Sequence, residues 1–288
     1  MRPPPSLRAR EARGTAALLA PAYLWLTAAV FVPLAVMLGL SFLTETPFGG
    51  RDWAVTLGQY EDALGKPLYR ELLRRSLLLA GEVTLWCVVI GWPAAFVLAK
   101  VIGPRRRGAL FLLTILPFWS NGLVRVFSWA ILLRGAGVID WAVEGLTPLE
   151  VEGSLLFTRE AVVIGLVHAY LPYVVLTGYL SISAIGDDLL EAARSLGASR
   201  WLVFLRVVAP LSLPGVAAGA ALVFVPVAGA FMEPRILGGR EGTFLGTVIE
   251  DQFTAVFNWP FGAALSFVLL AAVLAVLAVS APAVRAAR

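Results

Sequence analysis

Residues 186–210 form the most informative stretch of this 288-residue sequence, reading GDDLLEAARSLGASRWLVFLRVVAP from Gly186 to Pro210. They lie between two strongly apolar runs, residues 161–185 and 211–234, each long enough to cross a bilayer as a helix. A segment of this length with helix signals of its own is not an ordinary connector. It therefore predicts a separate structural element between two membrane spans.

Helix signals divide this segment into two short helices. Asp188 is a candidate N-cap, and Glu191 follows at the spacing of a capping box. Gly197 is suited to close this helix in a left-handed conformation, and Ser199 is suited to cap a second helix that runs to a turn at Pro210. We predict that the two helices cross at Gly197, where a Cβ atom would clash.

Small side chains on the first helix favour contact with another surface. Ala192 and Ala193 leave room for close approach. The alternative is a compact amphipathic loop that lies on the bilayer. The local pattern leaves both interpretations open.

The composition indicates that lipid is the solvent of this chain. Hydrophobic residues make up 59% of it and charged residues 15%, and its mean hydropathy is +0.83. Unpaired backbone groups are not tolerated in lipid, so the apolar runs should be helices; the alternating pattern of a β-barrel is absent. The sequence predicts an all-α polytopic membrane protein with about six transmembrane helices, at residues 16–43, 76–102, 109–133, 161–185, 211–234 and 261–282.

Basic residues set the predicted orientation. With the N-terminus inside, thirteen Lys and Arg residues fall on the cytoplasmic side and nine outside, and Arg105, Arg106 and Arg107 form a cluster beside a membrane end. We predict that both termini are cytoplasmic, with residues 1–15 as a cytoplasmic segment and residues 16–288 as one six-helix domain. The basic residues are scattered over short loops, which argues against a nucleic-acid partner.

Several chemistries are excluded by residue types that are missing. One cysteine, Cys87, and one histidine, His168, can form neither a disulfide within the chain nor a metal cluster. Neither Lys66 nor Lys100 is followed by Ser or Thr, so no phosphate-binding loop for ATP is present. We therefore expect no cofactor, no metal site and no enzymatic activity in this chain.

Four ionisable side chains fall inside the predicted spans. Glu82, Arg125, His168 and Glu233 all lie in the outer half of the membrane at similar depth, and such residues are functional candidates because their charge is costly in lipid. Glu82 and Arg125 on neighbouring helices suit a structural ion pair as well as they suit contact with cargo. Glu233 also suits a solvated position just past its helix, and His168 suits a contact between helices.

Aromatic side chains accompany these charges. Trp119, Trp129, Tyr170 and Tyr173 are candidates for stacking on a cation. The alternative role for such residues is packing or anchoring at the membrane interface.

Residues 186–210 also resemble a known family signature. Glu191, Ala192, Ala193 and Gly197 match the Glu-Ala-Ala, three residues, Gly pattern of binding-protein-dependent ABC importer permeases. We call residues 186–210 the coupling segment, because in that family it is the docking site of the ATPase. The signature ends in Ile, one residue, Leu-Pro, and here Val207 and Ala209 replace the Ile and Leu.

Three other stretches resemble the spermidine/putrescine permease subgroup of this family. They are residues 125–129, 229–239 and 252–262. One departure affects the cargo: the subgroup usually has Glu after the first Gly of the second stretch, whereas Ala230 stands here and an acid follows only at Glu233.

The resemblance implies the permease subunit of an ATP-driven importer in the bacterial inner membrane, with a small solute as cargo, most closely a polyamine. It assigns coupling to the ATPase to Glu191, Ala192, Ala193, Gly197 and Pro210. It also implies three protein partners: a cytosolic ABC ATPase dimer, a second permease subunit that is homologous or identical, and a periplasmic solute-binding protein.

The sequence leaves two alternatives to a polyamine importer open. One is an ABC permease for another small solute. The other is a secondary transporter driven by an ion gradient, with Glu82 or Glu233 as its ion site.

Overall fold

The computed structural model of the protein describes residues 5–45, 54–135 and 154–286. Within these ranges the chain is almost entirely helical, and a single β-bridge joins Leu43 to Val55. The all-α fold class predicted from the apolar runs is confirmed. The helices are α1 (Pro5–Leu40), α2 (Gly58–Gly65), α3 (Pro67–Phe96), η1 (Val97–Val101), α4 (Pro104–Trp119), α5 (Gly122–Leu132), α7 (Arg159–Ser183), α8 (Asp187–Ser195), α9 (Arg200–Val203), η2 (Phe204–Val208), α10 (Ala209–Ala228), α11 (Met232–Leu237), α12 (Leu245–Thr254) and α13 (Trp259–Ala286).

Five of the predicted spans contain continuous stretches of helix, although at residues 211–234 the helix ends at Ala228, before the predicted end at Pro234. They are long and apolar enough to cross a membrane, and they run over Leu18–Leu40, Pro67–Val101, Arg159–Ser183, Arg200–Ala228 and Trp259–Pro282. The first belongs to a helix that begins at Pro5, so the basic N-terminal residues continue directly into the span.

The predicted span at residues 109–133 differs, because it consists of two helices. α4 ends at Trp119 and α5 begins at Gly122, with extended backbone at Ser120 and Asn121 between them. The Asn121 side chain accepts a hydrogen bond from the Leu123 N–H at 2.9 Å, which caps α5 and stabilises the break. The total of six spans therefore stays a prediction.

Close packing of α3, α7 and α10 forms the centre of the bundle. Glycines make this approach possible: a Cβ atom added to Gly91 or Gly178 would lie 3.0–3.1 Å from side chains of the neighbouring helix. On α10, Gly215 and Gly219 form a Gly-xxx-Gly pattern facing α7, a pattern that lets membrane helices approach closely.

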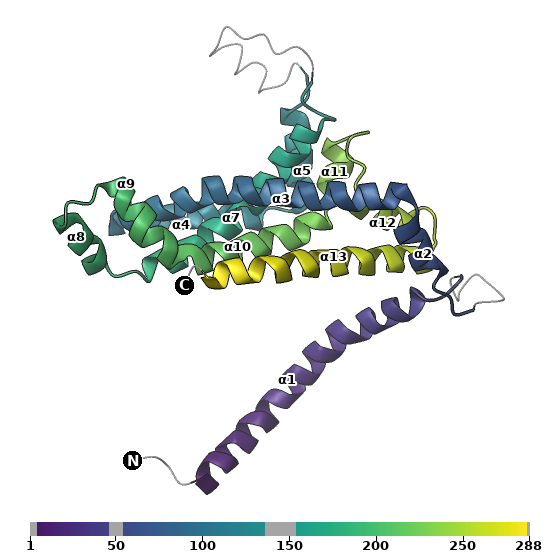
Figure 1. The fold of residues 1–288 in the computed structure, drawn as a ribbon, viewed down its shortest axis with the longest axis horizontal. Coiled ribbons are helices and arrows are strands. Elements are labelled where there is room, and N and C mark those ends of the chain that lie inside the picture. Colours follow the sequence, from purple (N-terminus) through teal and green to yellow (C-terminus); the bar gives the residue numbers. More distant parts are fainter. Residues whose placement is uncertain (1–4, 46–53, 136–153, 287–288) are drawn as a thin grey trace.

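The two ends of the bundle have different structures (Figure 1). α8 and α9 lie at one end, and the N-terminal end of α1 and the C-terminal end of α13 lie toward that same end. The short helices α2 and α12 lie at the opposite end.

Helix α1 stands apart from the rest of the bundle (Figure 1). Its apolar span buries none of its residues against the described chain. It is tied to the bundle at its C-terminal end, where the hydroxyl groups of Ser41 and Tyr60 are 2.7 Å apart.

Two π-helical segments lie at the end of the bundle that carries α8 and α9. η1 continues α3, and η2 joins α9 to α10. In each of them a backbone N–H reaches the carbonyl five residues back: Ile102 to Val97 and Ala209 to Phe204. Such segments are often found at functional sites.

Candidate coupling segment and outer charge cluster

The coupling segment contains one separate short helix, α8, as its sequence predicts, whereas the second predicted helix is the start of the continuous helical span Arg200–Ala228. α8 ends at Ser195, and Gly197 follows with φ of +84°, the left-handed conformation that glycine adopts at low cost. The Ser199 hydroxyl then accepts a hydrogen bond from the Leu202 N–H at 3.3 Å, so the predicted cap of the second helix is confirmed.

The predicted start and end of the coupling segment are wrong in detail. α8 begins at Asp187 with Gly186 as its N-cap, so Asp188 lies inside the first turn and does not cap the helix. Pro210 makes no turn: α9 continues through η2 into α10, and Pro210 lies in the first turn of α10. A proline is tolerated at this point of a continuous helix because the π-helical bonding of η2 immediately precedes it.

The predicted clash at Gly197 is also wrong for this chain alone. A Cβ atom built there has no described atom within 4 Å. The need for glycine at this position comes from the backbone conformation, and the space around it is open.

An exposed surface runs along the coupling segment. Glu191 and Ala192 are exposed, Ala193 is half-buried, and Leu190 on the opposite face of α8 is buried. Leu196 and Trp201 are 89% and 69% exposed. Two large apolar side chains beside small and acidic ones form a surface suited to contact with another protein.

The partner of Glu82 differs from the one expected. Glu82 on α3 forms an ion pair with Arg159 at the start of α7, not with Arg125. The reason is the packing of the helices, since α3 runs along α7 whereas α5, which carries Arg125, packs against α11.

Glu82 and Arg159 line a pocket of about 570 Å³ between α3, α5 and α7. Two indole rings, of Trp86 and Trp129, and the carboxylate of Glu160 also line it. The Trp129 Nε1–H donates a hydrogen bond to His168 Nδ1 at 3.1 Å, so His168 makes the predicted contact between helices. We call this pocket, with its two carboxylates and one guanidinium, the outer pocket.

A second group of predicted site residues meets at α11. Arg125 interacts electrostatically with Glu233 and with Tyr170. Glu233 lies past the end of α10, as one interpretation of the sequence held, yet its residue is only 9% exposed and so is not solvated. Tyr170 stacks on Tyr173, with ring centroids 5.9 Å apart.

The remaining candidate, Trp119, lies apart from these residues. It is 82% exposed at the end of α4. Tyr173 instead meets Phe118, edge to face, with ring centroids 4.8 Å apart. The aromatic candidates therefore divide between the outer pocket, the α11 group and an exposed helix end.

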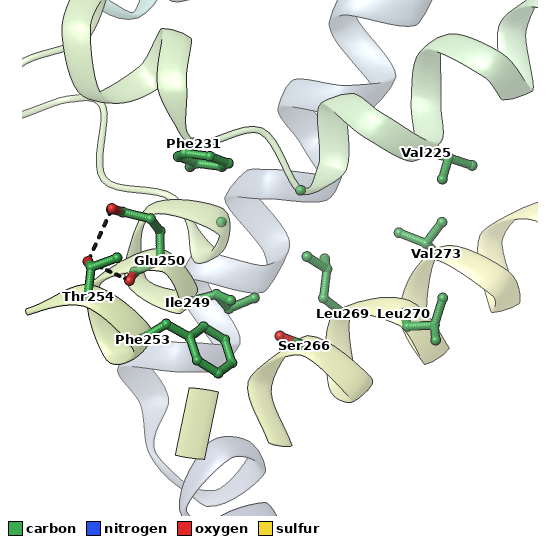
Figure 2. Close-up of a pocket in the computed structure, with 12 residues that line it drawn as sticks. Val225, Phe231, Ile249, Glu250, Phe253, Thr254, Ser266, Leu269, Leu270 and Val273 are labelled. Carbon is green, nitrogen blue, oxygen red and sulfur yellow. Dashed lines mark hydrogen bonds between the residues drawn. The ribbon is translucent and has the colours of Figure 1, made fainter. Parts of the chain in front are cut away.

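Another pocket of about 460 Å³ lies between α10, α12 and α13 (Figure 2). Figure 2 shows Glu250 and Thr254 close together in it, with the apolar side chains of Val225, Leu270 and Val273 farther away. Arg235 Nη2 lies 2.6 Å from Glu250 Oε2, so the acid at this pocket already has a cationic neighbour.

Sequence reasoning did not single out Arg159 or Glu250. Both residues lie outside the predicted spans, and only charged residues inside those spans are functional candidates on the ground that charge is costly in lipid. Arg159 immediately precedes an apolar run. This position is the one feature of the sequence that indicates that its side chain can reach an acid inside the membrane.

Comparison with known families identifies the kind of protein that carries these features. Residues 88–287 match the family described as binding-protein-dependent transport system inner membrane component. The chain belongs to this family of ABC importer permeases. The match includes the whole coupling segment, and it favours the importer permease over the secondary transporter.

Relatives of this permease have names that match the subgroup resemblance. The spermidine/putrescine transport system permease protein PotB of Escherichia coli K12 is 41% identical over 245 residues, covering 85% of this chain and 88% of its own. The PotB protein of Haemophilus influenzae is 38% identical over 242 residues, covering 84% of each chain.

Solved structures confirm the fold of the permease. A bacterial ABC transporter that imports the polysaccharide alginate has a TM-score of 0.76 at 16% identity, with 96% of each chain covered. The MetNI methionine ABC transporter has a TM-score of 0.58 at 16% identity, covering 77% of this chain and 99% of its own. These identities are low, so the likeness concerns the fold alone.

Proposed function

We propose that this chain is the permease subunit of an ATP-driven importer of spermidine and putrescine. The observation that carries the transport mechanism is the coupling segment, in which an exposed left-handed Gly197 follows an exposed Glu191 and Ala192. The assignment of the cargo rests on the PotB relatives, which match this chain over most of their own length.

The coupling segment has the properties of a docking site for a separate ATPase. Its exposed face combines small side chains with Leu196 and Trp201, and the space beside Gly197 is open. The chain itself has no phosphate-binding loop, so ATP hydrolysis belongs to a partner. We assign contact with that ATPase to Glu191, Ala192, Ala193 and Gly197, with Pro210 at the start of α10 behind them.

The outer pocket fits a cationic cargo. Glu82 and Glu160 supply two negative charges against one positive charge on Arg159, which leaves a negative balance. The indole rings of Trp86 and Trp129 offer faces for a cation–π interaction with an amine. An aliphatic polyamine has both the charges and the apolar chain that such a pocket accommodates.

The orientation follows from the coupling segment. An ATPase is cytosolic, so the end of the bundle with α8 and α9 faces the cytoplasm, together with both termini. The opposite end, with α2 and α12, then faces a periplasmic binding protein. A second permease subunit, homologous or identical, completes the pathway; the alginate and methionine transporters named above are ABC transporters of the same fold.

A substitution at Gly197 tests the mechanism. Gly197→Asp should fold, since a Cβ atom meets nothing within 4 Å and Asp is among the residues that tolerate the left-handed region best. It should abolish uptake and weaken copurification of the ATPase, because it puts bulk and charge on the docking face. Glu191→Lys should do the same to a smaller extent.

The matched control is Gly108→Asp, at an exposed glycine of α4 that also has nothing within 4 Å of its Cβ position. It should leave both measurements unchanged, with the same monodispersity in detergent as the wild type. Full ATP-dependent uptake and normal ATPase association in Gly197→Asp would refute the docking role.

The cargo has its own test. Uptake of labelled spermidine into vesicles should be competed by putrescine, and not by alginate fragments or methionine. If neither polyamine is retained by the cognate binding protein while another small solute is, the cargo assignment is wrong and the permease assignment stands.

A further inference from the structure

A buried lysine links the coupling segment to a membrane helix. Lys100 lies on η1, at the end of the long span that α3 begins, and its side chain is only 9% exposed. Its Nζ donates hydrogen bonds to the backbone carbonyl of Ile185 at 2.6 Å and to Asp187 Oδ1 at 2.7 Å. Ile185 follows the end of α7, and Asp187 is the first residue of α8.

The Lys100 ammonium group interacts favourably with the end of α7 and with the start of α8. Carbonyls near the C-terminal end of a helix attract a cation, and a carboxylate in the first turn of α8 is stabilised by that helix's dipole. The Lys100 side chain is only 9% exposed, so removing either acceptor would leave its ammonium group with fewer hydrogen-bond partners. The contact therefore holds the start of the coupling segment firmly against α3.

The other end of the coupling segment is held against the same helix by aromatic rings. Phe204, the first residue of η2, packs on Trp92 and Phe96 of α3, with ring centroids 5.8 Å and 5.2 Å apart. Leu190 of α8 and Val203 of α9 are buried in one apolar cluster with Ala95, Leu98 and Ala99. The coupling segment thus has a polar attachment to α3 at one end and an apolar attachment at the other.

The helix that receives both attachments reaches the outer pocket. α3 and η1 form one helical span, and this span carries Glu82 and Trp86 at the pocket and Lys100 at the coupling segment. Glu82 and Lys100 are eighteen residues apart, or about 27 Å along a helix. A packed helix of this kind transmits a displacement at one end to the other, because close-packed interiors transmit strain.

We propose that Lys100 is a positioning residue for energy coupling. It fastens the start of α8 to α3, so that movement of the coupling segment moves α3 and the outer pocket together with α10. This inference rests on the proposed function, since it requires an ATPase that moves the segment. It differs from the docking role of Gly197 because the Lys100 side chain is only 9% exposed, whereas Gly197 is exposed.

The test separates docking from transmission. Lys100→Met keeps most of the side-chain volume and removes the charge, and Lys100→Arg keeps a cationic donor. We expect Lys100→Met to retain ATPase copurification and ATP hydrolysis while cargo taken up per ATP falls about fivefold or more. Lys100→Arg should recover part of that ratio.

Two further variants keep the inference falsifiable if Lys100→Met folds poorly. Asp187→Asn changes an exposed carboxylate, 77% exposed, and should lower the same ratio to a smaller extent without affecting assembly. Arg106→Met removes an exposed charge at the same end of the bundle and should leave the ratio unchanged.

The outcomes are distinct. A wild-type uptake-to-ATP ratio in Lys100→Met or Asp187→Asn would overturn the inference, and so would loss of ATPase association in both, because Lys100 would then serve docking. If the wild-type chain itself binds no ABC ATPase, the proposed function fails, and the failure is seen before any variant is made.

Discussion

The packing of α10 on α7 makes a specific prediction for Gly219→Ala. A Cβ atom at this position would lie 2.2 Å from Thr177 Oγ1 and 3.0 Å from Val174 Cα. The Thr177 hydroxyl is held by a hydrogen bond to the Tyr173 carbonyl at 2.9 Å, and a backbone Cα cannot turn aside. α10 must therefore move away from α7, which lies at the centre of the bundle.

The expected loss of stability is moderate. Overpacking of a well-packed core costs about 1–3 kcal/mol, and the better helix propensity of alanine returns up to about 1 kcal/mol. With the full return, the net loss is about 0–2 kcal/mol, which corresponds to a fall in the melting temperature of up to about 8 °C for a chain of this size.

Thermal unfolding in detergent, followed by tryptophan fluorescence, measures this fall. Gly81→Ala on α3 is the matched control, because nothing lies within 4 Å of its Cβ position, and its melting temperature should stay the same or rise. Adding Thr177→Ala to Gly219→Ala should restore part of the loss, since the shortest contact is then removed and the contact with Val174 remains. Equal melting temperatures for Gly219→Ala and Gly81→Ala would refute this account of the packing.

Three other predictions follow from contacts described above. Glu82→Gln should lower the melting temperature by a few degrees at most, as expected of a partly exposed ion pair worth about 1 kcal/mol or less, and the effect should shrink in an Arg159→Gln background. The same variant should weaken polyamine uptake, because it removes one of the two negative charges of the outer pocket, and unchanged uptake would contradict the cargo role of Glu82. In a cysteine-free background, Arg106→Cys should react with an impermeant maleimide from the cytoplasmic side only, and labelling from the periplasm would reverse the topology. The hydrogen bond from the Lys100 ammonium holds the pKa of Asp187 below its ordinary value of 3.8. The contribution of this pair to stability is therefore complete above that value and is lost as the pH falls through the lowered pKa. The difference in melting temperature between wild type and Asp187→Asn should stay constant from about pH 7 to about pH 5 and decrease only below about pH 4.

The long apolar runs were predictable from sequence because lipid imposes a simple demand on them. A run of about 20 apolar residues must be helical, and five of the six predicted runs contain one helix long and apolar enough to cross a membrane. The run at residues 109–133 satisfies the same demand in composition and yet breaks at Ser120. The break depends on the cap at Asn121, and a single polar side chain within an apolar run does not reveal whether it caps a helix or lies inside one.

The local structure of the coupling segment was predictable at Gly197 and Ser199 but not at its two ends, and the pairing of charges was not predictable. The conformation at Gly197 and the cap at Ser199 depend on residues close in sequence. The partner of Glu82 depends on which helices are neighbours, and hydropathy carries no information on that. The role of Lys100 was not predictable, because nothing in its sequence neighbourhood distinguishes a lysine held between helices from a solvated one.

The π-helical segments have a consequence for the angular relation between the two parts of each helix. A π turn holds one residue more than an α turn, so the side chains after it are rotated by about 100° from the positions that a regular helix would give them. If the whole stretch from α9 to α10 is treated as one regular α-helix, the residues of α9 are therefore assigned to the wrong face relative to those of α10. Converting Phe204–Val208 to regular α-helical geometry without changing its length would rotate the coupling segment by about a quarter turn about the axis of α10. The angle at which this chain presents its docking surface is thus set by the π-helical geometry of one five-residue segment.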